Sequence, residues 1–573
     1  MNNILEKYFN PLAIQLAFQR VKCWPDKMTK DLGGIYAFNS NLEINCKNLS
    51  NKIISESYKP QRGFKFYVPK PSKTLRTKTV LVVEDAIVFQ AIANVISQNN
   101  YDKLNQNSQF VYGSVLNQEV KKGTNILKDE KSNFFFFKFW QSLHEKYSDS
   151  IIQAIEVDKV KYKFETDITG FFDSIPHYNL LLTLSSQFDV EDEILDILGN
   201  CLNLWSGTKV GPTPGVGIPQ GPPPSFLLAN LLLHQLDEIL IDSGYFYLRY
   251  MDDITIFSFE ENELNNALLI IDKYTKSNGL SINSKKTIIK EIKEGEEDET
   301  ITKLKRKRFF NSYNSEDDDF IISVETKDSP NKSNKIHKNL AKLSQQDNSN
   351  EQGHLTTLSK PKEIIAYWKS QIIDVEKELP SLFVNKTSEP LKLLDSVDDI
   401  DAIRLSTAYG VALRELRLLK YDITANSFLL KYWLFFYEKF FWRADKLGYT
   451  LMNYSNSKEL KIKMIEMLNS NISNYEWSVY HILQNLSLTQ NFNQKELRQF
   501  YFKKLKSEDS NLVKISLYRL LYKHCKTQQL RATVQNQLNK ENSQYLKMII
   551  ANFNKFHNNE NINLDDFLNS IGL

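Results

Sequence analysis

The alternation of apolar and polar residues predicts a helical start to the chain, followed by a β-hairpin. Residues 1–60 follow a polar, helical pattern. The next segment mixes apolar and basic residues in two β-like runs, 63–71 and 77–83, so we expect a hairpin with its turn near residues 71–73. Apolar residues then recur over 84–96 with the 3.6-residue period of a helix. A helix should therefore follow the hairpin.

The middle of the chain, residues 160–290, alternates strand and helix signals. Its β-like runs at 162–166 and 245–257 are separated by helical stretches, which predicts an α+β unit. Residues 290–350 are polar, with acidic and basic blocks in turn, as is typical of a linker or a solvated insertion. From residue 361 onward amphipathic helical patterns recur without a clear strand, so we expect an α-helical array there.

Composition excludes several classes of protein. A chain of 573 residues is long enough for about three or four structural units. Lys and Arg number 72 against 69 Asp and Glu, a net charge of +3, so any site for an anion must be local. The four cysteines lie far apart in sequence and match neither a disulfide framework nor a zinc site.

No segment of the sequence predicts export or a membrane span. The first residues lack a basic stretch followed by an apolar one. The most apolar run, 428–442, carries three charged residues and is shorter than the ~20 residues of a spanning helix. We expect a buried, aromatic-rich helix at this run, and a cytoplasmic protein that does not bind membranes.

The first candidate for chemistry is the pair Asp252-Asp253, which lies between two β-like runs. Removing an ionised carboxylate from water costs several kcal/mol, so such a pair must face solvent or a cation. Oxygen ligands at a turn suit Mg²⁺, with Mn²⁺ as the alternative. An Asp-Asp turn is also ordinary hairpin chemistry, so the pair alone does not establish a metal site.

A further acid, Asp167, follows the β-like run 162–166 and precedes two aromatic residues, Phe171 and Phe172. Two divalent ions that bridge an attacking hydroxyl and a phosphate need carboxylates from separate elements. Asp167, Asp252 and Asp253 meet that requirement. Asp173 is a rival ligand, although a helix cap or turn is the favoured interpretation for it.

A third segment places Pro219-Gln220-Gly221 before a strongly apolar helix. Gly221 allows the backbone to approach a ligand closely. The prolines at 222–224 hold the loop extended, and Ser225 is the expected N-cap of the helix. Proline-rich turns before helices also occur without any function. This segment therefore indicates a functional site only in combination with the two acidic segments.

These segments together resemble reverse transcriptases, in the order and content of the family's motifs. The resemblance covers roughly residues 58–290. The matching segments are Pro69-Lys70 with Leu75-Arg76, Asp167-x-x-x-x-Phe172, Pro219-Gln220-Gly221, Tyr250-Met251-Asp252-Asp253, and 279–287.

The resemblance implies an α+β right-hand polymerase, with fingers and palm, followed by an all-α C-terminal domain, for which a repeat-like arrangement stays open. The expected divisions are an N-terminal helical segment at 1–60, fingers at 61–160, palm at 161–290, a polar linker or insertion at 291–355 and an α-helical domain at 356–573.

The resemblance also implies a role for each matching residue. Asp167, Asp252 and Asp253 would be the catalytic acids that bind Mg²⁺ or Mn²⁺. Phe172 would crowd the 2′ position of the sugar and favour deoxynucleotides. The alternative for Phe172 is an ordinary core aromatic beside Phe171.

The remaining matches would bind the nucleotide. Lys70 and Arg76 would meet the triphosphate, as suits a fixed charge and a bidentate fork; Lys73 is a weaker substitute. Gln220 and Gly221 would lie against the templating base and the incoming nucleotide. Lys286 would neutralise or protonate the leaving pyrophosphate, its alternative being a solvated lysine beside Lys285.

The sequence after the palm narrows the type of reverse transcriptase. Neither the Cys and His cluster of a zinc endonuclease nor the acids of an RNase H follow the palm. A polymerase joined to a long helical region resembles bacterial abortive-infection and antiphage defence reverse transcriptases. This resemblance implies synthesis of DNA from dNTPs on an RNA template; template-independent and protein-primed synthesis stay open. A noncoding RNA, a second copy of the chain and a partner protein are further candidate partners.

A second hypothesis concerns the C-terminal region. Arg519 and His524 have the Arg-x-x-x-x-His spacing of HEPN ribonucleases, although Leu520 departs from the polar residue usual in that family. A helical scaffold is the favoured interpretation. The basic run 303–308 is a solvated face or a contact for a nucleic-acid backbone. A palm that only binds structured RNA is disfavoured, because clustered carboxylates repel phosphates without a metal.

Overall fold

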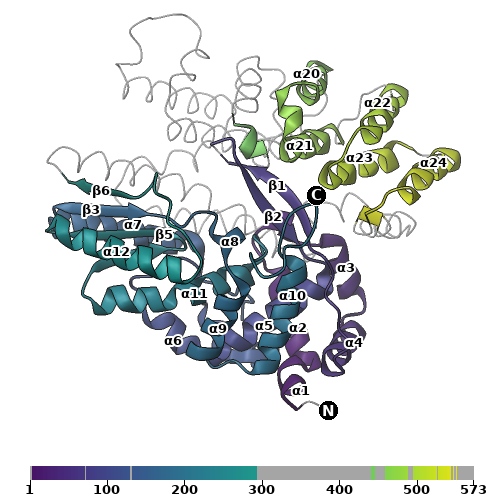
Figure 1. Cartoon of the computed structure of the whole chain (residues 1–573). Coiled ribbons are helices and arrows are strands. Elements are labelled where there is room, and N and C mark those ends of the chain that lie inside the picture. The colour runs from purple at the N-terminus through teal and green to yellow at the C-terminus, as the bar shows by residue number, and fades with distance from the viewer. Residues whose placement is uncertain are drawn as a thin grey trace, which may run out of the picture. The chain divides into compact units, whose positions relative to one another are not determined.

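The computed structural model describes most of the chain up to residue 292 and a set of helices beyond residue 440 (Figure 1). The described residues are 3–70, 72–129, 132–292, 440–444, 458–487, 494–525, 527–543, 546–547 and 550. The chain divides into two compact units. One contains Met1–Lys65 and Thr77–Ser312, and the other contains Phe66–Arg76 and Tyr313–Ile571.

Residues 3–54 are mainly helical, as the pattern predicts. They form α1 (Asn3–Phe9), α2 (Pro11–Lys22), α3 (Leu32–Ser40) and α4 (Leu42–Ile54), with the 3₁₀ turn η1 (Lys27–Thr29) between α2 and α3. Helix α2 packs against α4 and against α5 (Val83–Asn99), the helix predicted at 84–96. Because α5 is buried on all its faces from Asp85 to Ser97, it is the central helix of the first unit.

The predicted hairpin is present. Strands β1 (Phe64–Pro69) and β2 (Leu75–Val80) pair in a two-stranded sheet. The Lys70 amide donates to the Thr74 carbonyl at 2.8 Å, and Lys73 has a left-handed φ of 65°, which turns the chain between the strands.

A four-stranded antiparallel sheet, in the order β4-β5-β3-β6, lies in the predicted α+β region. Strand β3 (Tyr162–Thr166) coincides with a predicted run, and β4 (Phe246–Tyr250) and β5 (Asp253–Ser258) divide the other. The fourth strand, β6 (Ile288–Glu291), was not predicted. Helix α12 (Glu261–Ser277) packs along this sheet on β3 and β5 (Figure 1).

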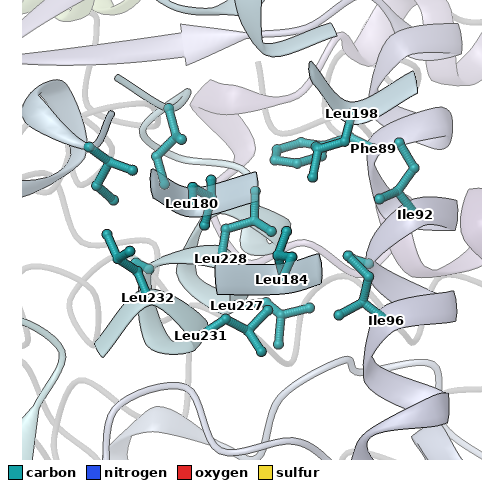
Figure 2. Close-up of a cluster of buried hydrophobic side chains, with 14 of the residues drawn as sticks. Phe89, Ile92, Ile96, Leu180, Leu184, Leu198, Leu227, Leu228, Leu231 and Leu232 are labelled. Atoms are coloured by element: carbon teal, nitrogen blue, oxygen red, sulfur yellow. The ribbon is translucent and has the colours of Figure 1, made fainter. Parts of the chain in front are cut away.

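The core of the first unit lies where α5 meets helices α9 (His177–Gln187), α10 (Asp192–Trp205) and α11 (Pro223–Asp242). Figure 2 shows this cluster of leucine, isoleucine and phenylalanine side chains, which includes Phe89, Leu184 and Leu228. The remaining elements of this unit are α6 (Tyr101–Gln106), η2 (Gln118–Lys128), α7 (Trp140–Ile152), η3 (Gln153–Val157) and α8 (Phe171–Ser174).

The predicted N-cap Ser225 is wrong. Helix α11 begins at Pro223, because proline at the first helical positions loses no hydrogen bond and has a helical φ. Ser225 therefore lies inside the helix, where its hydroxyl donates to the Pro219 carbonyl.

Beyond residue 440, every regular element in the described part of the chain is a helix. These elements are η6 (Phe441–Arg443), α20 (Lys458–Leu468), η7 (Asn471–Asn474), α21 (Glu476–Ser487), α22 (Gln494–Lys506), α23 (Asn511–His524) and α24 (Gln528–Asn539). The predicted linker, the basic run 303–308 and most of the apolar run 428–442 fall outside the described residues. Among the helices that are described, each is too short or too polar to span a bilayer.

Candidate active site

The pairing of β3 with β5 brings three carboxylates to one end of the sheet. The strands are antiparallel, with Thr166 opposite Ile254. The next residue along β3 is Asp167, so the register continues to Asp253. Since Tyr250 pairs with Asp253, the β4–β5 turn contains only Met251 and Asp252. Asp167, Asp252 and Asp253 therefore lie at the same end of the sheet, although Asp167 comes from a distant segment of the chain.

The turn itself is strained. Met251 has a φ of 56°, in the left-handed region, which costs a residue with a side chain about 1–2 kcal/mol. Its carbonyl accepts a hydrogen bond of 2.7 Å from Nη1 of Arg249. Gly113 lies close behind, because a Cβ at that position would be 2.5 Å from the Met251 amide nitrogen. Only glycine allows this close approach to the turn.

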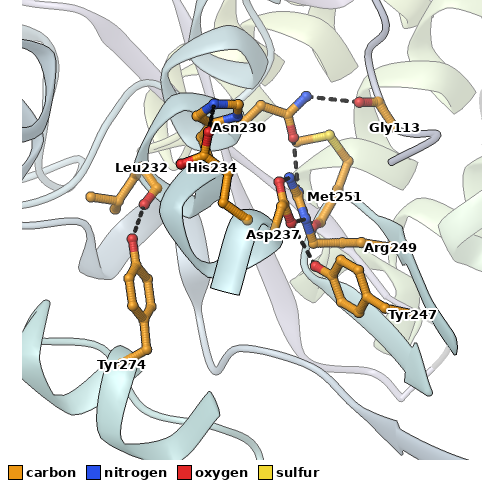
Figure 3. A network of polar contacts seen from close by, with 10 residues as sticks. Gly113, Asn230, Leu232, His234, Asp237, Tyr247, Arg249, Met251 and Tyr274 are labelled. Atoms are coloured by element: carbon orange, nitrogen blue, oxygen red, sulfur yellow. Dashed lines mark hydrogen bonds and ion pairs between the residues drawn. The ribbon is translucent and has the colours of Figure 1, made fainter. Parts of the chain in front are cut away.

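A buried polar network supports the turn from the core side (Figure 3). Arg249 forms a bidentate ion pair with Asp237 of α11, with Nε–Oδ1 and Nη2–Oδ2 distances of 2.7 and 2.6 Å. Tyr247 donates to the same Asp237 carboxylate at 2.6 Å. Arg249 also donates to Asn230, whose amide reaches the Gly113 carbonyl at 2.7 Å. Helix α11, strand β4 and the chain at Gly113 are thus joined behind the β4–β5 turn.

Sequence analysis did not find this network. The available signal was Arg249, a lone charged residue inside the apolar run Phe246–Tyr250, which implies a buried partner. Asp237, within the apolar face of α11, gave the matching signal. Nothing in the sequence paired the two residues.

The site is electronegative. Burial, the Asp253 carboxylate and the Asp167 carboxylate together raise the pKa of Asp252 to about 6. The opposing charge is that of Lys286, whose ammonium group donates to Oδ2 of Asp167. This hydrogen bond raises the pKa of Lys286. With one cation against three acids, the end of the sheet attracts positive charge.

The acids fit a divalent cation. Oδ1 of Asp167 is buried and has no hydrogen-bond partner among the described residues, and a buried oxygen without a partner is costly unless a cation or water binds it. An all-oxygen donor set suits Mg²⁺ or Mn²⁺. Within the described ranges, no three Asp, Glu, His or Cys side chains form a ready-made metal-binding group. At Asp167 the positive charge comes from Lys286 instead.

Phe172 and the Pro-Gln-Gly loop, which carry the other predicted residues of the first unit, are hydrogen-bonded to each other. Phe172 is 7% exposed and packs edge-on against Phe226, with ring centroids 5.2 Å apart. Its carbonyl accepts from the Ile218 amide at 2.8 Å, which ties α8 to the Pro-Gln-Gly loop. In that loop, the Gln220 carbonyl accepts from Thr79 at 2.9 Å. Phe172 thus contributes to the core; its contact with a sugar stays a prediction.

Gly221 has a φ of 130°. A Cβ there would lie 2.3 Å from Cγ2 of Thr29, so this position also requires glycine. The rival metal ligand Asp173 lies within the short helix α8 rather than at its N-cap.

Five candidate residues belong to the second unit. Lys70, half-buried, and Arg76, exposed, lie at the tip of the hairpin with the exposed Lys73. Arg519, on α23, donates to Gln484 of α21 at 2.6 Å. The side chain of His524 lies outside the described residues, so the ribonuclease hypothesis stays untested.

Comparison with known proteins gives one family. Residues 68–310 match the family model described as reverse transcriptase (RNA-dependent DNA polymerase). A search of curated proteins finds no match to this sequence.

Solved structures of telomerase also align with the chain. A truncated apo telomerase from Candida tropicalis is 12% identical, with a TM-score of 0.28, and the alignment covers 44% of this chain and 56% of that one. Telomerase from Candida albicans, in complex with a fragment of telomeric RNA, is 10% identical, with a TM-score of 0.31, over 83% of this chain and 64% of that one. Scores this low do not establish a common arrangement of elements. The chain spans less than two thirds of the length of either telomerase.

Proposed function

Because the chain carries a reverse transcriptase domain over residues 68–310, the nucleotidyltransferase domain of RNA-directed DNA polymerases, we propose that it copies RNA into DNA from dNTPs. The observation that carries the proposal is the convergence of Asp167, Asp252 and Asp253, which the β3–β5 register brings to one end of the sheet. The partnerless Oδ1 of Asp167 supports a cation there.

In the proposed reaction the 3′ hydroxyl of a primer loses its proton to solvent, and its oxygen forms a bond to the α-phosphorus of a dNTP. The bond from that phosphorus to the bridging oxygen breaks, and pyrophosphate leaves. Bound Mg²⁺ or Mn²⁺ would activate the hydroxyl and stabilise the charge on the phosphate. The three acids would hold the cations. Lys286, whose ammonium group already lies beside Asp167, would neutralise or protonate the pyrophosphate.

Selection of the nucleotide falls to the remaining residues. Phe172 would exclude a 2′ hydroxyl, and its fixed packing on Phe226 gives the ring the rigidity that steric exclusion needs. Gln220 and Gly221 would face the base pair. Lys70 and Arg76 would bind the triphosphate through charge-assisted hydrogen bonds.

The test is to incubate the purified chain with Mg²⁺ and dNTPs, with and without an RNA template and primer, and to sequence the product. DNA complementary to the RNA, absent with an Asp252→Ala, Asp253→Ala variant, is the expected result. DNA of unrelated sequence would indicate the template-independent reaction instead of templated copying. DNA linked to the protein would indicate the protein-primed reaction. The absence of acid-dependent DNA would refute the polymerase.

We further propose an antiphage role, in the bacterial cytoplasm, for this polymerase. The support is the layout of a reverse transcriptase domain followed by helices, since every regular element described beyond residue 440 is helical. Expression in bacteria should reduce phage plaque numbers, and the Asp252→Ala, Asp253→Ala variant should not. Equal plaque numbers with both chains would contradict this role.

A further inference from the structure

The hairpin β1–β2 has too few strands to hold its own shape. It is a two-stranded sheet, and isolated hairpins of this size are marginally stable in water. Its tip, Phe66–Arg76, groups with the helices of the second unit rather than with the first. The tip carries Lys70 and Arg76, so whatever holds the tip also fixes these two side chains.

Phe66 is the apolar anchor of the tip. It is 1% exposed, and its ring stacks on Trp477 of helix α21, with centroids 6.0 Å apart and planes 8° from parallel. Trp477 is itself 5% exposed. Burial of two aromatic rings against each other is among the stronger apolar contacts in proteins. A hairpin without this helix would lose the ring that stacks on Phe66.

Glu476 closes the open edge of β1. The Lys70 amide bonds across to Thr74, so by the two-residue alternation of a strand the Tyr67 amide faces away from β2. That amide donates to Oε1 of Glu476 at 2.5 Å. Pro69, the next outward position, has no amide hydrogen to satisfy. The two outward amide positions of β1 nearest the tip therefore leave no unpaired N–H at the edge.

The same carboxylate ties this contact to the rest of the helical unit. Its Oε2 accepts from the hydroxyl of Ser510. Ser510 is the N-cap of α23, where its side chain accepts from the Val513 amide. Helices α21 and α23 pack against each other. Glu476 thus joins the hairpin, α21 and α23 through one side chain.

We propose that Glu476 and Trp477, which we call the clasp, hold the fingers hairpin in position to bind dNTPs. The proposal rests on the proposed function, because it takes Lys70 and Arg76 as ligands of the triphosphate. Glu476 and Trp477 are positioning residues that act through the hairpin. The two residues then set how well Lys70 and Arg76 bind the triphosphate.

The test uses the full chain with Trp477→Ala and with Glu476→Ala. The matched control is Glu541→Ala, which removes a glutamate bonded to Tyr518 and Lys514 in the same helical unit but not to the hairpin. In Trp477→Ala and Glu476→Ala, the backbone amides of peptides from the hairpin tip should exchange hydrogen at least about fivefold faster than in the wild type. The KM for dNTP should rise by about five- to tenfold, with kcat within about twofold. Glu476→Gln, which keeps an acceptor for the Tyr67 amide, should restore most of the protection.

Two results would overturn the clasp. Hairpin exchange equal to that of the wild type in both variants would show that the contact does not hold the tip. A KM that stays within about twofold of the wild type while exchange rises would show that the hairpin's position does not govern nucleotide binding. If the wild type itself makes no DNA, the proposed function fails, and the exchange measurement still decides whether the clasp holds the hairpin.

Discussion

The ion pair between Arg249 and Asp237 should control both the stability of the first unit and the geometry of the β4–β5 turn. Both side chains are almost wholly buried, at 1% and 3% exposure. Replacing Arg249 by Met removes the positive partner and leaves the Asp237 carboxylate without it in the core. Removing one partner of a buried pair costs about 3–5 kcal/mol. Arg249→Met should therefore lower the free energy of unfolding by that amount.

A second variant separates stability from positioning. Asp237→Leu combined with Arg249→Met removes both charges, and apolar replacement of a whole buried pair is often neutral. The double variant should recover most of the stability lost by Arg249→Met. It should not recover activity, because the Met251 carbonyl still lacks the donor that held it at 2.7 Å.

The assay is urea unfolding followed by circular dichroism, together with dNTP incorporation on an RNA template. If Arg249→Met lowers the free energy of unfolding by less than about 1 kcal/mol, the reasoning is refuted, since removing one partner of a buried ion pair costs more than that. Wild-type activity in the double variant would refute the positioning of the turn by Arg249.

Three further predictions concern the same site. Because protons compete with cations for Asp252, whose pKa is about 6, the apparent affinity for Mg²⁺ should fall about tenfold between pH 7 and pH 5; a titration that gives equal affinities would contradict this. Gly113→Ala should lower the incorporation rate at least about tenfold, since its Cβ would lie 2.5 Å from the turn backbone. Gly199→Ala, whose Cβ meets only the end of the Leu181 side chain at 3.2 Å, is the matched control and should keep full activity. Phe172→Val should lower the preference for dNTP over rNTP, measured as a ratio of kcat/KM, by at least about tenfold; an unchanged ratio would leave Phe172 as a core residue only.

Local pattern was sufficient to predict strands β3, β4 and β5 and the acids that follow or join them. Strand β3 ends where its β-like run meets Asp167, and the β4–β5 turn falls at Asp252. Both follow from residues next to each other in the chain. The central helix α5 was predicted for the same reason, since its apolar positions keep a helical period.

The features that escaped prediction depend on contacts between distant residues. The alignment of Asp167 with Asp253 comes from the order of strands in the sheet, which no local pattern gives. Strand β6, with the pattern Ile-Ile-Lys-Glu, is short and mostly exposed, so it carries no alternation to detect. The contact of Tyr67 with Glu476 joins residues 409 positions apart. Ser225 was misread because the prolines before it allow a helix to begin earlier than a hydroxyl cap implies.

The most direct test of the catalytic site is the single-turnover rate of one dNTP addition to an RNA-templated primer. The rates of Asp167→Asn and Asp252→Asn are to be compared with that of Asp173→Asn, an acid from the same segment that we place outside the metal site. Loss of at least about a thousandfold in the first two variants, with Asp173→Asn within about threefold of the wild type, is the predicted result. Wild-type rates in either of the first two variants would contradict catalysis by these carboxylates.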